Sequence, residues 1–379
     1  MKILAVDIGT GTQDILLFDT QLDVENNLKM VQPSPTMITH RRIKEATHQK
    51  KGIFLSGVTM GGGPSHWAVE EHLAAGLPVY AVPSAAQSFN DDLEIVQASG
   101  IQLAGEHEAK TLSSDVVRLT LKDFDFEMIA RAFEQFRVSL ADLDVLAIAV
   151  FDHGAAPPGY SDRQFRFDYI AKRVREKPLL SAFSYLSDEL PAIMTRMSAV
   201  AHSASEVGLP LVVMDTAPAA VLGAMQDRVV AKADEFLVTN VGNFHTIGFH
   251  MWREEIRGVF EHHTGMLDTA KLDGLLTRLG NGCLTHREVF GDHGHGALTS
   301  SRAGKRDKDA EFEVSVTGPR WRMMQHSRLR PHFATPHGDM MMSGCFGLVK
   351  SVAIHFPDYQ EEIEAALGSG REKPPWELP

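Results

Sequence analysis

The chain has 379 residues, of which 44% are hydrophobic and 23% are charged, so it can bury a sizeable core and is not globally disordered. Its 49 Asp plus Glu and 37 Lys plus Arg residues give a formal net charge of −12. This charge argues against a general nucleic-acid binder, because such proteins need a basic surface. A chain of this length fits two lobes, or one large α/β unit with insertions.

Cysteine usage and hydropathy predict the compartment. The two cysteines, Cys283 and Cys345, are too few for a disulfide framework or for an iron–sulfur cluster within one chain, and they favour a reducing cytoplasm. The first apolar run, 3–6, is broken by Asp7 and is too short for a secretory signal. The longest apolar run, 145–151, is about a third of a membrane span. We therefore expect a cytoplasmic protein with no membrane partner and no nucleic-acid partner.

The first half of the chain predicts a hairpin followed by alternating strands and helices. Apolar runs at 3–6 and 15–18 flank a turn rich in Gly and Thr, which is typical of a β-hairpin. From residue 53 onward strands and helices alternate, which predicts a parallel sheet. The expected strands are 53–58, 79–82, 115–121 and 145–151, and the expected helices are 65–75, 84–98 and 126–138.

The second half continues this α/β pattern. We expect polar, irregular chain at 155–180 and His-rich helix and loop residues at 250–300. The other expected elements are helices at 188–205, 217–227 and 340–354, strands at 209–216, 311–317 and 332–336, and a strand–turn–strand at 235–251. The expected organisation is a first lobe at 1–210, a second lobe at 211–360 and a tail at 361–379, of which the last dozen residues have the composition of a loose end.

An internal repeat relates the two halves of the chain. VDIGTGTQDILLF aligns with TNVGNFHTIGFHM, so that Asp7 matches Asn240 and Gly9 matches Gly242. In both segments a polar turn and an apolar strand follow the glycine. Similar hairpins at the start of two halves predict a duplicated α/β fold with a cleft between the halves.

The first hairpin turn has residues suited to phosphate. Gly9 and Gly11 permit positive φ angles and the close approach of a ligand to the backbone. Consecutive N–H groups in such a turn form an anion-binding concavity, and Thr10 and Thr12 add hydroxyl donors. Asp7, at the strand end, can hold a hydrated Mg²⁺ that contacts the phosphate. The alternative interpretation is an ordinary hairpin turn.

Five segments, taken in order, resemble the superfamily of actin, sugar kinases and heat-shock-chaperone ATPases. VDIGTGT resembles the first phosphate loop, DTAPAAVLGAM the connecting helix, and FLVTNVGNFHTIGF the second phosphate loop. VSVTGPRW is similar to the adenosine-contact turn, and GDMMMSGCFGLVKSVAI is similar to the closing helix. The resemblance implies a two-lobed, duplicated actin-like ATPase (ribonuclease-H-like) α/β fold, with an extra α/β insertion in the first lobe at about 40–140.

The same resemblance implies ATP with Mg²⁺ as the cofactor, with Asp7 on the metal. The residues implied for cofactor binding are Asp7, Gly9, Thr10, Gly11, Thr12, Asn240, Gly242, Asn243, His245, Thr246, Gly318 and Pro319. The second turn departs from the family pattern, because Asn240 stands where many members have Asp. Asn243, Phe244 and His245 replace the usual glycines. Phe244 and His245 can crowd a terminal phosphate, or His245 can contact the phosphate or the substrate itself.

A narrower set of segments resembles one bacterial and archaeal family along most of the chain. These segments are VTMGGGP, FDHG, GNFHT, EHHT, HGHG and HGDMMMSGCFG. That family is sometimes labelled as a pyruvate formate-lyase activating enzyme. A radical S-adenosylmethionine enzyme needs three clustered cysteines, whereas Cys283 and Cys345 are separated by 61 residues and have no third partner. We therefore do not expect that activity, unless two chains share one cluster.

An acid and a histidine follow the buried run 145–151. Ligands gather at the carboxyl ends of parallel strands, and this run ends at Asp152 and His153, just before Gly154. A carboxylate in this place can act as a general base on a hydroxyl or water, so Asp152 and His153 are catalytic candidates. The alternative is a turn carboxylate that accepts a hydrogen bond from a nearby backbone N–H.

Two further segments can recognise anions. Arg163 and Arg166 suit carboxylate or phosphate, but they belong to a solvated loop unless residues 155–168 fold over the cleft. The turn 61–64 (GGGP) precedes a helix whose N-terminus can receive an anion. Alternatively, Ser65 caps that N-terminus.

Seven histidines lie from residue 245 to residue 295, and several stand beside acids. The tightest groups are EHHT and DHGH, in which the metal candidates are His262, His263, His293 and His295. Imidazole and carboxylate suit Zn²⁺, Fe²⁺ or Mn²⁺, so a transition metal is a second candidate cofactor. Surface or hydrogen-bonding histidines are the alternative. Glu261 is a catalytic candidate in either case.

The function that the resemblance implies is a nucleotide-dependent ATPase or small-molecule phosphotransferase, and the residues themselves support phosphate-turn chemistry beside acids. One alternative is a metal-dependent enzyme that uses the Glu/His groups and has a degenerate nucleotide site. A second alternative is a nucleotide-gated activator or assembly factor. The expected partners are a nucleotide and either a small molecule or a partner enzyme.

Overall fold

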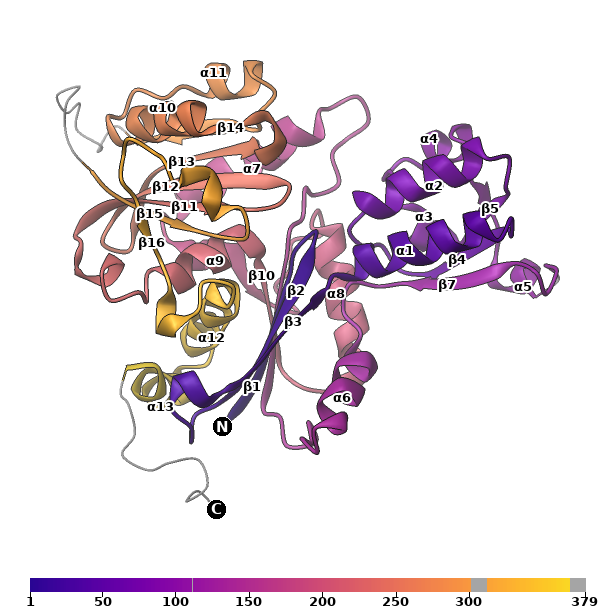
Figure 1. Ribbon diagram of the computed structural model, residues 1–379, viewed down its shortest axis with the longest axis horizontal. Helices are drawn as coiled ribbons and strands as arrows, with labels where there is room; N and C mark the ends of the chain where they lie inside the picture. Colours follow the sequence, from indigo (N-terminus) through magenta and orange to yellow (C-terminus); the bar gives the residue numbers. More distant parts are fainter. Residues whose placement is uncertain (111, 301–311, 369–379) are drawn as a thin grey trace.

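The computed structural model describes residues 1–110, 112–300 and 312–368, which form two six-stranded sheets and a smaller third sheet (Figure 1). The first sheet has the order β3-β2-β1-β8-β10-β9, and the second has the order β14-β13-β12-β11-β15-β16. The strands of the first sheet are β1 (Lys2–Ile8), β2 (Thr12–Asp19), β3 (Leu28–Pro33), β8 (Val145–Val150), β9 (Ser184–Leu186) and β10 (Leu211–Asp215). Those of the second are β11 (Glu235–Val241), β12 (His245–Trp252), β13 (Glu255–His263), β14 (Gly296–Thr299), β15 (Glu313–Thr317) and β16 (His332–Phe333).

Five strands of each large sheet follow one pattern. In the first sheet, β1, β2 and β3 form an antiparallel meander, and β8 and β10 continue in parallel beside β1. In the second sheet, β11, β12 and β13 form the meander, and β15 and β16 continue in parallel beside β11. The turns also match, because Gly9 N–H donates to the Thr12 carbonyl at 2.9 Å and Gly242 N–H donates to the His245 carbonyl at 3.0 Å. The predicted repeat is a structural duplication, and the predicted two-lobed fold is confirmed.

The third sheet is inserted between β3 and β8, which confirms an α/β insertion in the first lobe. Its order is β6-β5-β4-β7, and all of its strand pairs are parallel. Ser34 begins the insertion, because its hydroxyl accepts from Met37 N–H at the start of the first helix and a proline follows it. The elements are α1 (Pro35–His48), β4 (Ile53–Gly57), α2 (Pro64–Ala74), β5 (Val79–Ala81), α3 (Pro83–Ala86), α4 (Leu93–Ala98), β6 (Gln102–Leu103), α5 (Glu106–Ala109) and β7 (Val117–Leu121). Figure 1 shows this inserted domain beside the first lobe.

The remaining helices cover the faces of the two large sheets. Helices α12 (Ser343–His355) and α13 (Pro357–Gly368) pack on one face of the first sheet, and α6 (Phe126–Gln135) and α8 (Thr195–Ala204) pack on the other. Helix α10 (Thr269–Gly280) packs on one face of the second sheet, near α11 (His286–Gly291). Helix α9 (Thr216–Ala224) contributes to the cores of both lobes, through Ala219 in one and Val221 in the other. None of the helices in the described residues is both long enough and apolar enough to cross a membrane.

Helix α7 (Asp162–Glu176) occupies much of the stretch for which the sequence predicts irregular chain. It packs with the strands of the second lobe, although it follows β8 of the first. Its buried apolar residues recur at helical spacing: Phe167, Ile170, Ala171 and Val174. Many charged residues lie between these apolar positions. The segment is therefore polar on average, and its helical period is hard to see in the sequence.

Other stretches also differ from the prediction. The His-rich segment contains β13, a nine-residue strand whose buried polar residues disguise it. The helix predicted over 84–98 is two short helices, because the chain turns at 87–92 and Asp92 caps a new helix by accepting from Glu94 N–H. Residues 361–368, predicted as tail, belong to α13, whereas 369–379 lie outside the described residues.

Candidate functional site

The two matching turns meet at one cavity between the lobes. Gly9, Thr10 and Thr12 line it from the first turn, and Gly242, Asn243 and His245 line it from the second. The turns are in contact at Gly11, where a Cβ atom would lie 2.7 Å from Asn243 Nδ2. The prediction that they face each other across a single cleft is therefore confirmed. Neither Gly9 nor Gly11 uses the positive φ that glycine permits; the close approach of another chain segment is what restricts Gly11.

Other predicted cofactor residues divide into two groups. Asn240, Gly318 and Pro319 line the same cavity, together with Asp7. The turn at Gly318 has φ +100°, and a Cβ atom there would lie 2.3 Å from Asn240 Oδ1, so only glycine fits beside the end of β11. Thr246 does not line the cavity; it is fully buried and shares a 2.9 Å hydrogen bond with Thr264.

Two buried carboxyl groups, Asp7 and Asp14, line this cavity opposite each other on β1 and β2. Burial raises the pKa of Asp7 to about 7. The hydroxyl of Thr216, which donates to Asp7 Oδ1 at 2.5 Å, lowers this pKa, whereas the negative charge of Asp215 raises it further. Burial raises the pKa of Asp14 to about 8, and the charges of Asp7 and Asp339 add to this. Within the described residues, Asp14 Oδ1 has no hydrogen-bond partner. Sequence analysis missed Asp14, although its place opposite Asp7 in the predicted hairpin was a usable signal.

The start of α12 closes over Asp7. A Cβ atom on Gly344 would lie 1.8 Å from Asp7 Oδ2, so this position can hold only glycine while the carboxylate keeps its place. Buried carboxylate oxygens with an unpartnered lone pair are the ligands that Mg²⁺ prefers. The residues present therefore fit a divalent cation at Asp7 and Asp14.

We expect Asp14→Asn to flatten the pH dependence of stability. Because the pKa of Asp14 is raised from 3.8 to about 8, the folded chain keeps a proton in this range that the unfolded chain has released. Stability therefore falls as the pH rises from about 4 to about 8, and the asparagine variant lacks this contribution. Melting temperatures measured with chelator at several pH values in this window should fall less steeply in the variant. Asp115→Asn, at an exposed acid, is the control, and parallel curves for wild type and Asp14→Asn would contradict the expectation.

A second cavity adjoins the first and is lined by the inserted domain. The glycines of the turn 61–63 line it together with Asp91, and β8 contributes Asp152 and His153 at its end. Thr10, Phe151, Arg196, Phe244 and His245 line both cavities. The two cavities therefore lie side by side, with the matching turns at the first and the inserted domain at the second.

Side-chain contacts hold the glycine-rich turn in place. Thr36 Oγ1 donates to the Gly62 carbonyl at 2.6 Å, and Ser65 Oγ donates to the same carbonyl at 2.8 Å. Ser65 is not the cap of α2, because the helix begins at Pro64 and Gly63 precedes it without a side-chain cap. Trp67, on the exposed face of α2, stacks on Phe244 with ring centroids 5.6 Å apart, so the inserted domain also contacts the second turn.

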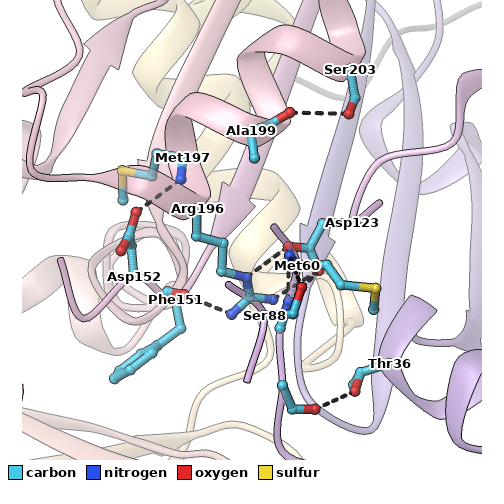
Figure 2. Close-up of polar contacts among 12 residues, drawn as sticks. Thr36, Met60, Ser88, Asp123, Phe151, Asp152, Arg196, Met197, Ala199 and Ser203 are labelled. Carbon is cyan, nitrogen blue, oxygen red and sulfur yellow. Dashed lines mark hydrogen bonds and ion pairs between the residues drawn. The ribbon is translucent and has the colours of Figure 1, made fainter. Parts of the chain in front are cut away.

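Arg196 connects the inserted domain to the first lobe (Figure 2). Its Nε donates to Asp123 Oδ2 at 2.7 Å and its Nη2 donates to Asp123 Oδ1 at 3.0 Å. Its Nη1 donates to the Phe151 carbonyl at 2.7 Å, at the end of β8. Gly61 N–H also donates to Asp123, which places the glycine-rich turn against the same ion pair. The sequence gives no local signal for this pair, since its partners are 73 residues apart.

Asp152 has the structural role that the sequence offers as the alternative, because its carboxylate accepts hydrogen bonds from nearby backbone N–H groups. Its Oδ2 accepts from Met197 N–H at 2.8 Å (Figure 2). Its Oδ1 accepts from Gly154 N–H, also at 2.8 Å, so it fixes the turn after β8 to the first turn of α8. Asp152 is also one of the residues that line the second cavity. Burial raises its pKa, while the two backbone N–H groups and the nearby arginines oppose this.

Arg166 is a buried hub that sequence analysis places in a solvated loop. Only 2% of it is exposed, and it lies at the start of α7 with its guanidinium carbon 3.8 Å from the centroid of the Phe151 ring. Two of its nitrogens donate to Glu261, at 2.8 Å from each carboxyl oxygen. Its Nη1 donates to Asp215 Oδ2 at 2.6 Å and to the Asp152 carbonyl at 2.7 Å. Burial alone would raise the pKa of Glu261, but Arg166 and His295 hold it well below its usual range.

Three histidines from different parts of the chain meet beside this hub. One ring nitrogen from each of His153, His245 and His295 lies within 4.8 Å of the others. Burial lowers the pKa of His153 to about 3 and that of His245 well below its usual value. His295 Nδ1 is 2.6 Å from Glu261 Oε2.

The predicted metal group of His262, His263, His293 and His295 is not the one that the structure assembles. Successive residues of a strand point to opposite faces, so His262 turns away from Glu261 and its Nε2 lies 3.2 Å from Asp292. His263 lies beside the trio, with its ring centroid 4.9 Å from that of His295. His293 is an exposed turn residue with φ +64°.

The duplicated sheets and the turns facing each other across the cleft define a protein of the actin-like ATPase fold. The chain belongs to the family described as "Putative pyruvate format-lyase activating enzyme (DUF1786)", whose model matches residues 60–323. No curated protein sequence matches the chain.

Several solved structures are similar to the chain at low sequence identity. They include ethanolamine utilization protein EutJ from Carboxydothermus hydrogenoformans, at 11% identity over 92% of this chain and 89% of that chain, with a TM-score of 0.32. An inorganic polyphosphate/ATP-glucomannokinase from Arthrobacter sp. strain KM has 12% identity over 93% and 99% of the two chains, with a TM-score of 0.35. A ROK family glucokinase from Streptomyces griseus has 13% identity over 92% and 98%, with a TM-score of 0.30.

Proposed function

We propose that this protein is a Mg²⁺- and ATP-dependent phosphotransferase that acts on a small hydroxyl-bearing molecule. The observation that carries the proposal is the pair of matching turns, Gly9–Thr12 and 242–245, on one cavity that also contains the buried carboxyl groups of Asp7 and Asp14. Backbone N–H groups of such turns suit phosphate oxygens. Asp7 and Asp14 would hold Mg²⁺, which neutralises phosphate charge when it is bound.

The second cavity is the proposed site of the acceptor. It continues from the phosphate turns and ends at Asp152, Asp91 and the turn 61–63. In the proposed reaction the acceptor oxygen bonds to the γ-phosphorus as the bond from that phosphorus to the β–γ bridging oxygen breaks. The acceptor proton passes to Asp152, whose position after β8 is fixed by two backbone N–H groups. Arg196 holds the wall of this cavity in place.

Iron–sulfur radical chemistry, which the family description suggests, does not suit the residues of this chain. A radical S-adenosylmethionine cluster needs three cysteine ligands, and the chain has only two cysteines. Cys345 is buried in the core of the first lobe, where its thiol donates to the Asp14 carbonyl at 3.1 Å, whereas Cys283 is exposed. A nucleotide-gated activator would bind nucleotide in the same cleft. The proposed enzyme differs from it in forming ADP catalytically.

We expect Gly9→Val to weaken the binding of Mg·ATP by roughly 5- to 150-fold, which corresponds to about 1–3 kcal/mol of steric overlap. A Cβ atom at Gly9 meets only the Thr12 carbonyl, at 3.2 Å, so the larger side chain extends toward the cavity. Gly265→Val is the matched control, because no atom lies within 4 Å of a Cβ atom there. Titration calorimetry of Mg·ATP on the folded variants tests this, and an unchanged affinity in Gly9→Val would place the nucleotide elsewhere.

A further inference from the structure

We propose that His153, His245 and His295 form a binding site for one transition-metal ion of the Zn²⁺ class, separate from the Mg²⁺ that the phosphotransfer proposal requires. Their ligating nitrogens lie within 4.8 Å of one another and come from three elements: the end of β8, the start of β12 and the turn before β14. A tetrahedral ion with bonds of about 2.0–2.1 Å needs nitrogens about 3.4 Å apart, so on binding each pair would move closer by up to about 1.4 Å.

Unpartnered nitrogen atoms point to a missing ligand. Within the described residues, the buried Nε2 atoms of His245 and His295 have no hydrogen-bond partner, and His295 is fully buried. A buried polar atom without a partner is costly, and native structures seldom retain one without a bound water, ion or ligand. His153 completes the group, and its ring lies 5.7 Å from each of the other two rings.

The surroundings of His295 are those of a metal ligand. Its Nδ1 is 2.6 Å from Glu261, which leaves Nε2 free to bind an ion. A carboxylate on the far nitrogen fixes the orientation of a metal-binding histidine and raises its basicity. Glu261 is fixed in turn by Arg166. Glu261 is thus a positioning residue for the proposed site.

The charge balance of this buried cluster also favours a cation. Glu261 and Asp215 carry two negative charges when ionised, whereas Arg166 supplies one positive charge to both of them. A divalent ion at the adjacent histidines offsets the remaining negative charge. Three imidazoles suit Zn²⁺ with one position left open. His153 and His245 also line the second cavity, so the open position faces the space proposed for the acceptor.

The test uses the full chain, freed of metal with a chelator, and Co²⁺ or Zn²⁺ alone without nucleotide. We expect close to one ion per chain, with the visible absorption bands of a tetrahedral, nitrogen-bound Co²⁺ ion that Zn²⁺ removes. His153→Gln and His245→Gln, which change cavity-lining ligands, should each lower the affinity by at least about 100-fold. His293→Asn is the matched control, because His293 lies in the same His-rich segment but outside the trio.

Two results would overturn the metal site. One is the absence of stoichiometric, competable Co²⁺ binding in the folded wild type. The other is binding that persists unchanged in both glutamine variants, or that His293→Asn removes. Circular dichroism shows whether each variant is folded. If a variant does not fold, the Co²⁺ titration of the wild type still decides whether the metal site exists. Nucleotide titrations are made separately, so failure of the metal site and failure of the nucleotide site give different results.

Discussion

Replacing Arg166 by alanine is expected to lower the free energy of unfolding by about 3–5 kcal/mol, the cost of removing one partner from a buried ion pair. The guanidinium group of Arg166 binds both Glu261 and Asp215, and it also donates to the Asp152 carbonyl. Its loss leaves two buried carboxyl groups without their main partner. The contacts join α7 to β10 of the first lobe and β13 of the second, so we expect both lobes to lose stability together.

Chemical denaturation of wild type and variant measures this loss. Arg163→Ala is the matched control on the same helix, since Arg163 is partly exposed, donates a hydrogen bond to the Gly294 carbonyl and lies over the Phe290 ring. We expect the control to cost roughly 1 kcal/mol or less. Similar losses in the two variants would show that Arg166 is not the central partner of the buried acids.

Asp152→Asn is expected to lower the rate of ADP formation by roughly 10²–10⁴-fold, the range for loss of a general base. Binding of Mg·ATP should remain, because Asp152 lines the second cavity and not the cavity of the phosphate turns. The structure adds a second expected effect. Asparagine has a single acceptor oxygen, so either Gly154 N–H or Met197 N–H loses its partner, at a cost of about 1–3 kcal/mol.

Turnover, nucleotide affinity and denaturation must therefore be measured on the same Asp152→Asn preparation. Asp91→Asn is the control, because Asp91 lines the same cavity from the inserted domain. A large loss of turnover in Asp91→Asn with little change in Asp152→Asn would assign the base to Asp91. Loss of nucleotide binding together with turnover in Asp152→Asn would indicate a structural role only.

The parts of the fold that the sequence predicts are those with local signals. The hairpins around Gly9 and Gly242 are short, their glycines and apolar runs are adjacent, and the two copies repeat the same spacing. The buried strand 145–150 is a continuous apolar run, and its end therefore locates Asp152. These signals are enough to predict both lobes and the cleft at which the two turns meet.

The rest of the site depends on contacts between distant segments. Arg166 is charged and has charged neighbours in the sequence. Its burial is possible because it forms an ion pair with Glu261, which is 95 residues away. The three histidines that meet in the structure are residues 153, 245 and 295, so proximity in the sequence selects a different group. Asp14 is an acid within an apolar strand, and its raised pKa results from burial beside Asp7.

The stack of Trp67 on Phe244 ties the inserted domain to the second lobe. An aromatic pair contributes about 0.5–1.5 kcal/mol beyond the area it buries, which corresponds to about a two- to twelve-fold change in an equilibrium constant. Trp67 belongs to the inserted domain, and Phe244 lines both cavities. The inserted domain is thus held at two places, by this ring pair to the second lobe and by the ion pair of Arg196 and Asp123 to the first lobe. Any displacement of the domain from the second lobe has to separate the two rings.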